Sequence, residues 1–475
     1  MARATRRDTR IAPEALAFAV SLTAMWVVGA SRPNAAMPDL GARGWAPGTL
    51  LPIALSPAAV TGVLWSAYGI AGLALVSAIR RRWQPEVGWF WPVLIAGLAL
   101  LTSPFGSADH LNYLAYGQIT LEGGDPWVQS PIGWQGGTDP LASHVEAPWT
   151  TQPSVYGPMA TLVHAACAWI GHDNLRVSVW VWQVVCVLAW LGVRALLRAH
   201  LPQRQHGRID VLWTFNPLVI GTGVLGAHLD LLAAALVVVA VWAWGRGGLG
   251  WAIVAGLAVA SAESTKFTYA VVAIPVILLG RSRRRDLVGF LGAGLAAAVL
   301  LHGWAGVASY VQILRSGQTV SLAMPWRPLL EGMLALGLPN GLARTVITVL
   351  AAALAVLLAS LFLRMSTPVD ERTRVLWVAG MLTAAFAFSA SYSLPWYDPL
   401  VWAALPATVS APVAMLATAR LTVIAMAYVP GRVTGMTEVV ENVTLGFRRF
   451  VAPALVLAVW VAAVRWARRR GWRPL

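Results

Sequence analysis

A carboxylate at the end of an apolar segment is the strongest candidate for chemistry in this chain. Asp109 follows the apolar run that ends near Pro104, within the polar segment 107–113. That position would place its side chain at the surface of a membrane, near the depth of the lipid headgroups. An aspartate whose pKa is tuned by partial burial could take a proton from a hydroxyl as a general base. A solvated acid at a helix end is the simpler interpretation of the same position.

Three more ionisable groups interrupt apolar segments. His228 and Asp230 lie in the Gly-rich segment 226–230, in a stretch that begins with Asn216-Pro217 and suggests a short half-helix. An ionisable group at membrane depth is costly unless it faces a polar cavity, so both are functional candidates. A buried polar pair that holds helices together is the alternative.

Lys266 lies between two apolar runs, and every other residue among the 35 Lys and Arg is arginine. A lysine there could bind a phosphate as a point charge. The alternatives are a snorkelling side chain or a salt bridge to Glu263.

The remaining candidates are polar or aromatic side chains in the segments that break the apolar runs. We expect substrate contacts from His110, Asp125, Tyr156, Arg327, Trp396 and Tyr397. Trp396 and Tyr397 could stack on a sugar or belong to the aromatic belt of a membrane protein. Pro and Gly around Asp125 and Tyr156 also suit simple turns, and Arg327 is a possible phosphate partner. No Walker loop, dinucleotide fingerprint or Cys/His metal spacing is present, so neither a metal site nor a cofactor is predicted.

The composition indicates the elements that must position these groups. Of 475 residues, 58% are hydrophobic and 12% are charged, which is about half the charged fraction of a soluble protein. The net charge of +15 comes from arginines clustered at the ends of apolar runs, as in 80–82, 281–285 and 465–470. That pattern marks the cytoplasmic ends of membrane helices rather than a nucleic-acid partner. The two cysteines form no disulfide framework.

The sequence therefore predicts an all-α polytopic membrane protein, a single integral-membrane domain over 1–475 with roughly 12–14 transmembrane helices. The N-terminus, with Arg6, Arg7 and Arg10, is expected inside. The segment 105–157 has no Lys or Arg and is predicted to be a large outer loop, which carries the chemistry. A second outer loop is expected at 304–342. Because 194–208 also looks cytoplasmic, one of the two apolar runs between 157 and 194 should be interfacial or re-entrant.

The order of these motifs resembles a known class of enzymes. The motifs are Asp109 with Tyr113 and Tyr116, Asp125-Pro126-Trp127, Tyr156-Gly157-Pro158, Asn216-Pro217 with 226–230, Lys266, and Pro395-Trp396-Tyr397. Over about 100–400 the chain resembles the GT-C glycosyltransferases. It is most similar to the actinobacterial polyprenol-phosphate-mannose-dependent α-mannosyltransferases that extend lipomannan-type glycolipids.

The resemblance implies a GT-C-like helical bundle with its active site on the outer face of the cytoplasmic membrane. It implies a polyprenyl-phosphate sugar donor, a lipid-linked glycan acceptor and inversion at the anomeric carbon. Asp109 would be the base. His228 and Asp230 would line the cavity, Lys266 would contact the donor phosphate, and Trp396 and Tyr397 would lie at the sugar side.

The expected function is transfer of mannose to a lipid-linked glycan. A polyprenyl-phosphate arabinofuranosyltransferase is the alternative within the class, because the leaving group is the same. A transporter or flippase of envelope lipids is the alternative from another class, and it predicts repeated halves and charges near the bilayer midplane. The expected partners are membrane lipids and the two lipid-linked substrates, with no nucleic acid.

Overall fold

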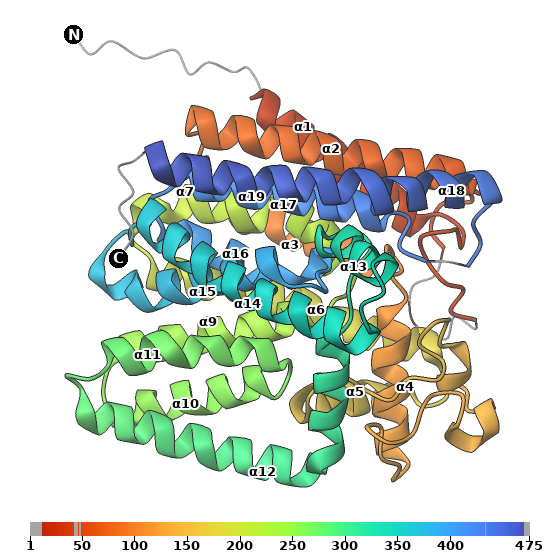
Figure 1. Ribbon diagram of the computed structural model, residues 1–475, viewed down its shortest axis with the longest axis horizontal. Helices are drawn as coiled ribbons and strands as arrows, with labels where there is room; N and C mark the ends of the chain where they lie inside the picture. The colour runs from red at the N-terminus through yellow and green to blue at the C-terminus, as the bar shows by residue number, and fades with distance from the viewer. Residues whose placement is uncertain (1–11, 42–45, 47–48, 433, 470–475) are drawn as a thin grey trace.

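The computed structural model describes residues 12–41, 46, 49–432 and 434–469, and its regular elements there are helical. Figure 1 shows most of the long helices running side by side in one bundle. This confirms the predicted all-α class. The expectations for Arg6, Arg7, Arg10 and Arg470 fall outside the described residues.

Within the described residues, seven helices are long and apolar enough to cross a membrane. Each has at least 18 residues, and about 20 are needed to span the hydrocarbon core. They are α1 (Pro13–Ala30), α2 (Pro57–Arg81), α6 (Leu175–His200), α12 (Arg284–Gly317), α14 (Asn340–Met365), α17 (Ala411–Tyr428), and the continuous Glu438–Arg469, which comprises α18 (Glu438–Gly446), η10 (Phe447–Val451) and α19 (Ala452–Arg469). The count of 12–14 crossings stays a prediction.

Shorter helices complete the bundle, and the predicted breaks lie between them. They are α3 (Phe90–Leu100), α9 (Asp230–Arg246), α10 (Leu249–Glu263), η6 (Phe267–Val272), α11 (Ala273–Leu279), η7 (Glu371–Thr373), α15 (Arg374–Ser389), η8 (Pro395–Tyr397), α16 (Pro399–Ala404) and η9 (Leu405–Ala407). Between α6 and α9 the chain forms η3 (Gln203–Gln205), α7 (His206–Ile209), η4 (Asp210–Thr214), α8 (Pro217–Val219) and η5 (Ile220–Val224). The break predicted around Asn216-Pro217 is confirmed, because a new short helix begins at Pro217.

The segment 105–157 gathers at one end of the bundle, at the right of Figure 1. It forms α4 (Asp109–Leu121), η1 (Trp134–Gly137) and η2 (Ala142–His144), and α5 (Pro158–Gly171) follows it. The helix α4 runs across the direction of the long helices. The basic ends of α2, α14 and α19, and the start of α12, lie at the opposite end. We call this opposite end the basic end.

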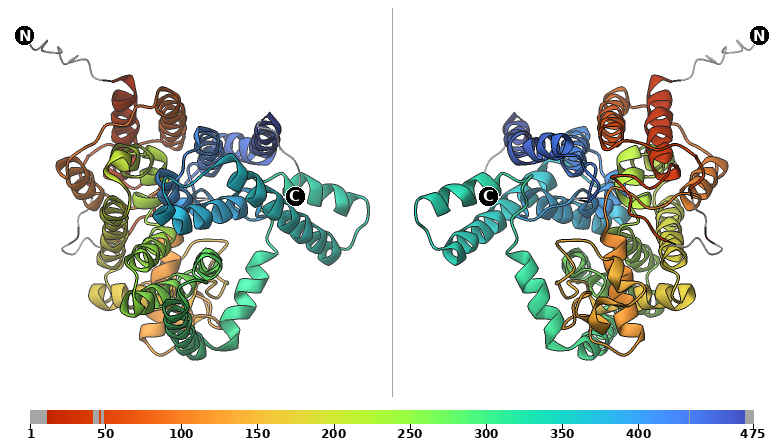
Figure 2. Two further views of the ribbon diagram at one scale, coloured as in Figure 1. Left: turned by 90° about the vertical axis from the view of Figure 1, so that its left-hand side faces the viewer. Right: turned by 90° about the vertical axis from the view of Figure 1, so that its right-hand side faces the viewer.

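The helix α12 changes direction before it reaches the segment 304–342. It bends at Gly306, whose φ of +69° suits glycine and strains other residues. Its last turns then cross from the level of α10 towards α13 (Trp326–Ala335), as Figures 1 and 2 show. The predicted second outer segment therefore contains the end of α12 and the whole of α13.

The lengths of α5 and α6 bear on the odd number of crossings expected between 157 and 194. It has 14 residues, so it is about 21 Å long, too short for a hydrocarbon core of about 30 Å. The helix α6 has 26 residues and is long enough to cross alone. The interfacial or re-entrant run expected between 157 and 194 stays a prediction.

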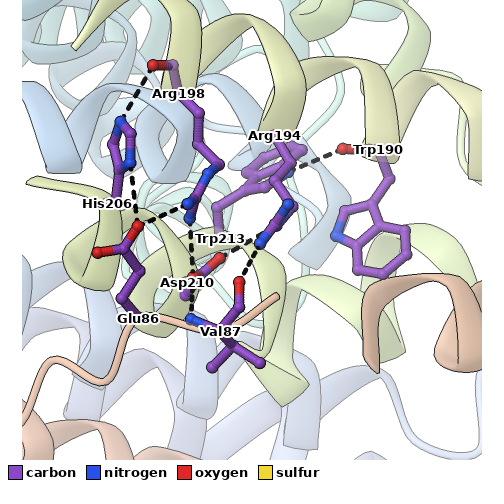
Figure 3. Close-up of polar contacts among 8 residues, drawn as sticks. All are labelled: Glu86, Val87, Trp190, Arg194, Arg198, His206, Asp210 and Trp213. Carbon is purple, nitrogen blue, oxygen red and sulfur yellow. Dashed lines mark hydrogen bonds and ion pairs between the residues drawn. The ribbon is translucent and has the colours of Figure 1, made fainter. Parts of the chain in front are cut away.

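A buried ion-pair network joins the α2–α3 connection to α6 and η4 (Figure 3). The Arg194 Nε lies 3.1 Å from Oδ1 of Asp210, and both side chains are fully buried. Arg198 Nη1 lies 3.1 Å from the other carboxylate oxygen of Asp210. The loop is attached through Val87, whose amide donates to Asp210 at 2.9 Å and whose carbonyl accepts from Arg194 at 2.7 Å. Asp210 therefore fixes three segments at once.

The rim of the same network is exposed. Glu86 accepts from Arg198 at 2.7 Å and lies 3.3 Å from His206 Nδ1, with 45% of its side chain exposed. Exposed ion pairs contribute little because water already solvates both charges. We therefore expect the buried pair to contribute strongly to the stability of the fold and the exposed rim to contribute little.

Replacing Asp210 with alanine should destabilise the protein strongly, because Arg194 would keep a buried charge with no partner. Removing one partner of a buried pair costs about 3–5 kcal/mol. We expect the apparent melting temperature in detergent, followed by tryptophan fluorescence, to fall by several degrees. The control Glu86→Gln should melt close to wild type. Equal melting temperatures for Asp210→Ala and Glu86→Gln would contradict this role.

Candidate active site

A cavity of about 1130 Å³ opens at the end of the bundle that carries 105–157. Its walls come from that segment, the Lys266 turn, the last turns of α12, the facing parts of α14 and α15, and the chain from Tyr428 to Arg448. Acids, bases, tyrosines and small apolar side chains all line it. This is the arrangement expected for a ligand with both polar and apolar parts.

Asp109 begins α4 and reaches this cavity with 14% of its side chain exposed. Its backbone amide donates to the Ser107 hydroxyl at 2.9 Å, which fixes the start of the helix. Burial raises the pKa of Asp109 to about 6, against the lowering effects of Ser107 and the Lys266 charge. A carboxylate with this pKa is ionised at neutral pH yet basic enough to accept a proton from a hydroxyl.

His228 lies directly behind Asp109. Its Nδ1 is 3.7 Å from the Asp109 carboxylate and 3.4 Å from the Tyr113 hydroxyl. The ring stacks on Trp396, with 3.7 Å between ring centroids and 8° between planes. His228 does not line the main cavity, so it orients Asp109 from behind rather than meeting a ligand.

Asp230 and Lys266 form an ion pair in the wall of the cavity. The Lys266 ammonium lies 2.8 and 3.0 Å from the two carboxylate oxygens of Asp230. The Tyr269 hydroxyl donates to the same carboxylate at 3.1 Å, and the ammonium lies 3.4 Å from the Tyr397 ring centroid. Asp230 already compensates the lysine charge, so Lys266 offers a ligand a hydrogen bond rather than a free charge.

Gly157 explains why the Tyr156-Gly157-Pro158 motif lies beside Lys266. The Gly157 and Met159 amides donate to the Thr265 and Ser264 carbonyls at 3.3 and 2.9 Å. A Cβ on Gly157 would lie 2.2 Å from the Ser264 carbonyl oxygen, so only glycine allows this approach. The contact places the start of α5 against the lysine turn.

Six of the predicted site residues line the cavity, and they come from distant parts of the sequence. They are Asp109, Tyr156, Asp230, Lys266, Trp396 and Tyr397. The Tyr156 ring packs edge-on against Tyr113, with centroids 4.9 Å apart. His228 joins the group through its contacts with Asp109 and Trp396.

The other three predicted residues lie away from the cavity. Asp125 accepts from the Trp127 amide at 2.9 Å in a turn, and the Trp127 indole donates to the Tyr156 carbonyl at 2.8 Å. Asp125 therefore contacts Tyr156 only indirectly, through Trp127. His110 is fully buried, and Arg327 pairs with Glu331 at 2.9 Å on α13.

Two ion pairs that the sequence interpretation missed also shape the site. Arg432 pairs with Glu146 and joins the 105–157 segment to the chain after α17. Arg420 lies 2.5 and 2.6 Å from the two carboxylate oxygens of Asp398, which anchors the Trp396–Tyr397 turn. Arg420 carries a detectable signal, because an arginine inside the apolar run 411–429 is an ionisable group at membrane depth.

Among the described residues, no three His, Cys, Asp or Glu side chains converge as a metal-binding group. The chemistry that the chain itself offers is the Asp109 carboxylate, whose pKa burial raises to about 6, beside a cavity with aromatic walls. Such a cavity can orient a hydroxyl and a sugar and can stabilise a leaving anion.

The Asp230–Lys266 pair predicts a non-additive double-mutant cycle. Lys266→Met should destabilise the protein by about 3–5 kcal/mol, because Asp230, 3% exposed, would be left without its partner. Asp230→Asn should also destabilise it. The double variant should recover a large part of the loss, as measured by apparent melting temperature. Strictly additive losses would show that the two side chains contribute independently.

Known proteins that are similar to this chain are mannopyranosyltransferases. A family model described as alpha-(1->6)-mannopyranosyltransferase, N-terminal domain, matches residues 15–282. Alpha-(1->6)-mannopyranosyltransferase B of Corynebacterium glutamicum is 25% identical over 253 residues, 50% of this chain and 38% of that protein. Alpha-(1->6)-mannopyranosyltransferase A of Mycobacterium tuberculosis is 29% identical over 185 residues, 37% of this chain and 34% of that protein. No solved structure matches the chain.

The matches to these two curated relatives therefore cover little more than a third of either protein's length. The family model itself covers more than half of this chain and includes Asp109, His228, Asp230 and Lys266. The chain belongs to the alpha-(1->6)-mannopyranosyltransferase family, a family of glycosyltransferases.

Proposed function

We propose that this protein transfers mannose from a polyprenyl-phosphate donor to a hydroxyl of a lipid-linked glycan, on the outer face of the cytoplasmic membrane. The observation that carries the proposal is Asp109, a carboxylate with a pKa of about 6 in the wall of a large cavity. The family match supports mannose over arabinose as the sugar.

In the proposed reaction Asp109 accepts the proton of the acceptor hydroxyl. The acceptor oxygen attacks the anomeric carbon of the donor as the bond from that carbon to the phosphate oxygen breaks. The electron pair leaves with the polyprenyl phosphate, and the anomeric configuration inverts. A phosphate monoester is a stable leaving group, so orientation and one base are the main requirements.

The other cavity residues have roles that fit this reaction. His228 holds the carboxylate from behind, so Asp109 presents its other side to the cavity. Lys266 donates its remaining N–H to an oxygen of the donor phosphate. Tyr156 and Tyr397 offer aromatic faces and hydroxyls to the sugar rings.

The distribution of arginines supports the proposed orientation. The basic end of the bundle would face the cytoplasm under the positive-inside rule. The segment 105–157, which contains no Lys or Arg, and the cavity beside it would then face outward. A lipid-anchored donor and a lipid-anchored acceptor both reach that surface from within the membrane.

Asp109→Asn should abolish transfer while leaving the fold intact, because asparagine keeps the shape and loses the base. Loss of general base catalysis lowers kcat by about 10²–10⁴-fold. The assay supplies purified protein in lipid with radiolabelled polyprenyl-phosphate mannose and a mannosylated glycolipid acceptor. The matched control is Glu122→Gln, an exposed acid at the end of the same helix and outside the cavity. Wild-type turnover by Asp109→Asn would contradict the assignment of Asp109 as the base. Transfer from polyprenyl-phosphate arabinose, with none from the mannose donor, would contradict mannose as the sugar.

The pH dependence follows from the raised pKa of Asp109. The base must be ionised, so kcat should rise with pH through about 6 and level off above it. Well below pH 6, kcat should fall about tenfold for each pH unit. An unperturbed aspartate would instead place this limb near pH 4. A flat profile between pH 5 and 7 would contradict a base with this pKa.

A further inference from the structure

The ion pairs of the cavity wall leave two cations and two carboxylates of its lining without an oppositely charged Lys, Arg, Asp or Glu partner among the described residues. Its walls carry four carboxylates and four cationic side chains. These are Asp109, Glu146, Asp230 and Glu441, and Lys266, Arg315, Arg432 and Arg448. Two of the cations are compensated, because Lys266 pairs with Asp230 and Arg432 with Glu146. Arg315 and Arg448 pair with no carboxylate of the described residues.

Arg448 is the better fixed of these two arginines. Its Nε donates to the Ala427 carbonyl at 2.6 Å, and its guanidinium carbon lies 4.6 Å from the Tyr428 ring centroid. The side chain is half-buried, which is costly for a charge without a counter-ion. It also lies in the π-helical turn η10, a distortion that is frequent at functional sites. A held, half-buried cation at a cavity wall suits an anionic ligand.

Arg448 belongs to one helical face that forms a wall of the cavity. Positions 441, 444, 445 and 448 all line it and lie on one face of α18 and η10. Among these four, Glu441 and Arg448 are the ionisable members. Of these two, Arg448 lies closer in the sequence to α19, which follows η10 directly.

A second wall of the cavity is apolar and belongs to a membrane-spanning helix. Thr348, Ala351, Ala352 and Ala355 line it from one face of α14. Ile313, Leu322 and Phe386 add to this lining. The three alanines leave space along the helix, so this lobe is suited to a hydrocarbon chain that enters from the bilayer. We call it the α14 lobe.

A row of aromatic rings connects Arg448 to Asp109. Asp109 lies 3.7 Å from His228, which stacks on Trp396 at 3.7 Å. The Trp396 ring lies 6.1 Å from Tyr428, whose ring lies under the Arg448 guanidinium. Trp396 and Tyr428 both line the cavity. A sugar ring along this aromatic row would have the carboxylate at one end and the guanidinium at the other.

We propose that the Arg448 guanidinium binds the phosphate of the polyprenyl-phosphate donor, and that the α14 lobe receives the first isoprene units of its chain. The inference rests on the proposed function, since it takes the donor to be a polyprenyl phosphate. A planar guanidinium can donate two parallel hydrogen bonds to phosphate oxygens.

The same contact would assist the chemistry as well as binding. When the bond to the anomeric carbon breaks, the departing electron pair turns a phosphate diester into a monoester with more negative charge. A fixed cation attracts this product more strongly than it attracts the donor, which favours departure. Lys266, whose charge Asp230 already compensates, supplies only a hydrogen bond.

The test uses polyprenyl phosphate and its dephosphorylated alcohol, polyprenol, as probes of the full-length purified protein. Arg448→Gln should weaken polyprenyl phosphate binding about 30-fold or more and leave polyprenol binding unchanged. Arg449→Gln is the matched control, because Arg449 is exposed, pairs with Glu331 and does not line the cavity. Arg448→Lys, which keeps a charge without the planar fork, should bind with intermediate affinity.

Transfer kinetics provide a second measurement on the same variants. Arg448→Gln should raise the KM for the donor and lower kcat, with no change in the KM for the acceptor. A purely structural role would instead lower the affinities for polyprenol, donor and acceptor together, and would overturn the proposal. The apparent melting temperature of each variant confirms that the comparison is made on folded protein.

Two results separate failure of this inference from failure of the proposed function. If Arg448→Gln binds polyprenyl phosphate as wild type does, the Arg448 assignment is wrong and the proposed reaction stands. If the wild type neither binds polyprenyl phosphate nor transfers sugar from it, the donor class is wrong and both proposals fall. Unchanged polyprenyl phosphate binding in Asp109→Asn, together with loss in Arg448→Gln, supports separate sites for base and phosphate.

Discussion

The cost of burying charge in an apolar bundle governs this structure. Arg194, Lys266 and Arg420 each lie against a buried or nearly buried aspartate. Such pairs hold segments in place, because separating them would leave a charge with neither water nor partner. Against that background, the half-buried ionisable groups that line the cavity without an oppositely charged Lys, Arg, Asp or Glu partner among the described residues are candidates for ligand contact. Asp109 and Arg448 are two of these groups.

The helix breaks have a related cause. Backbone groups freed from a helix at membrane depth must find partners or line a polar cavity. The break before α9, the Lys266 turn and the Trp396–Tyr397 turn all meet at the same cavity. Each break places a polar or aromatic side chain in the cavity wall: Asp230 at the first, Lys266 at the second, and Trp396 and Tyr397 at the third. The cavity is therefore built from interruptions of the bundle, and the long helices hold those interruptions at fixed distances.

Much of this was predictable from the sequence, for physical reasons that differ between residues. Asp109, Asp230 and Lys266 are conspicuous because an ionisable residue beside an apolar run has few roles other than pairing or function. Arg327 stays a predicted site residue, although it pairs with Glu331 at the i,i+4 spacing of a helix and does not line the cavity. The 12–14 expected crossings outnumber the seven helices of the described residues that are long and apolar enough to span, because many of the apolar runs form short or broken helices.

Arg448 illustrates what the sequence alone could not show. Beside Arg449, it looks like one more basic pair flanking an apolar helix. Only the fold reveals that the two arginines point to different places, Arg449 to Glu331 and Arg448 over Tyr428 into the cavity. Adjacent residues on a helix point about 100° apart, and the contacts that separate the two arginines are with residues 21 and 118 positions away.

The cavity is complete only where the two halves of the chain meet. The first of these, the residues up to Lys266, supplies the acid and its supports, Asp109, His228 and the Asp230–Lys266 pair. The second half supplies Trp396, which stacks on His228. Contacts that join the halves around the opening include His228 with Trp396, Lys266 with the Tyr397 ring, Glu146 with Arg432, and Gln312 with the Trp127 carbonyl at 3.1 Å. In the proposed reaction the sugar lies between Asp109, the proton acceptor in one half, and Arg448, the phosphate-binding cation in the other. The distance between these two groups, and with it the reaction geometry, would therefore depend on how the halves pack.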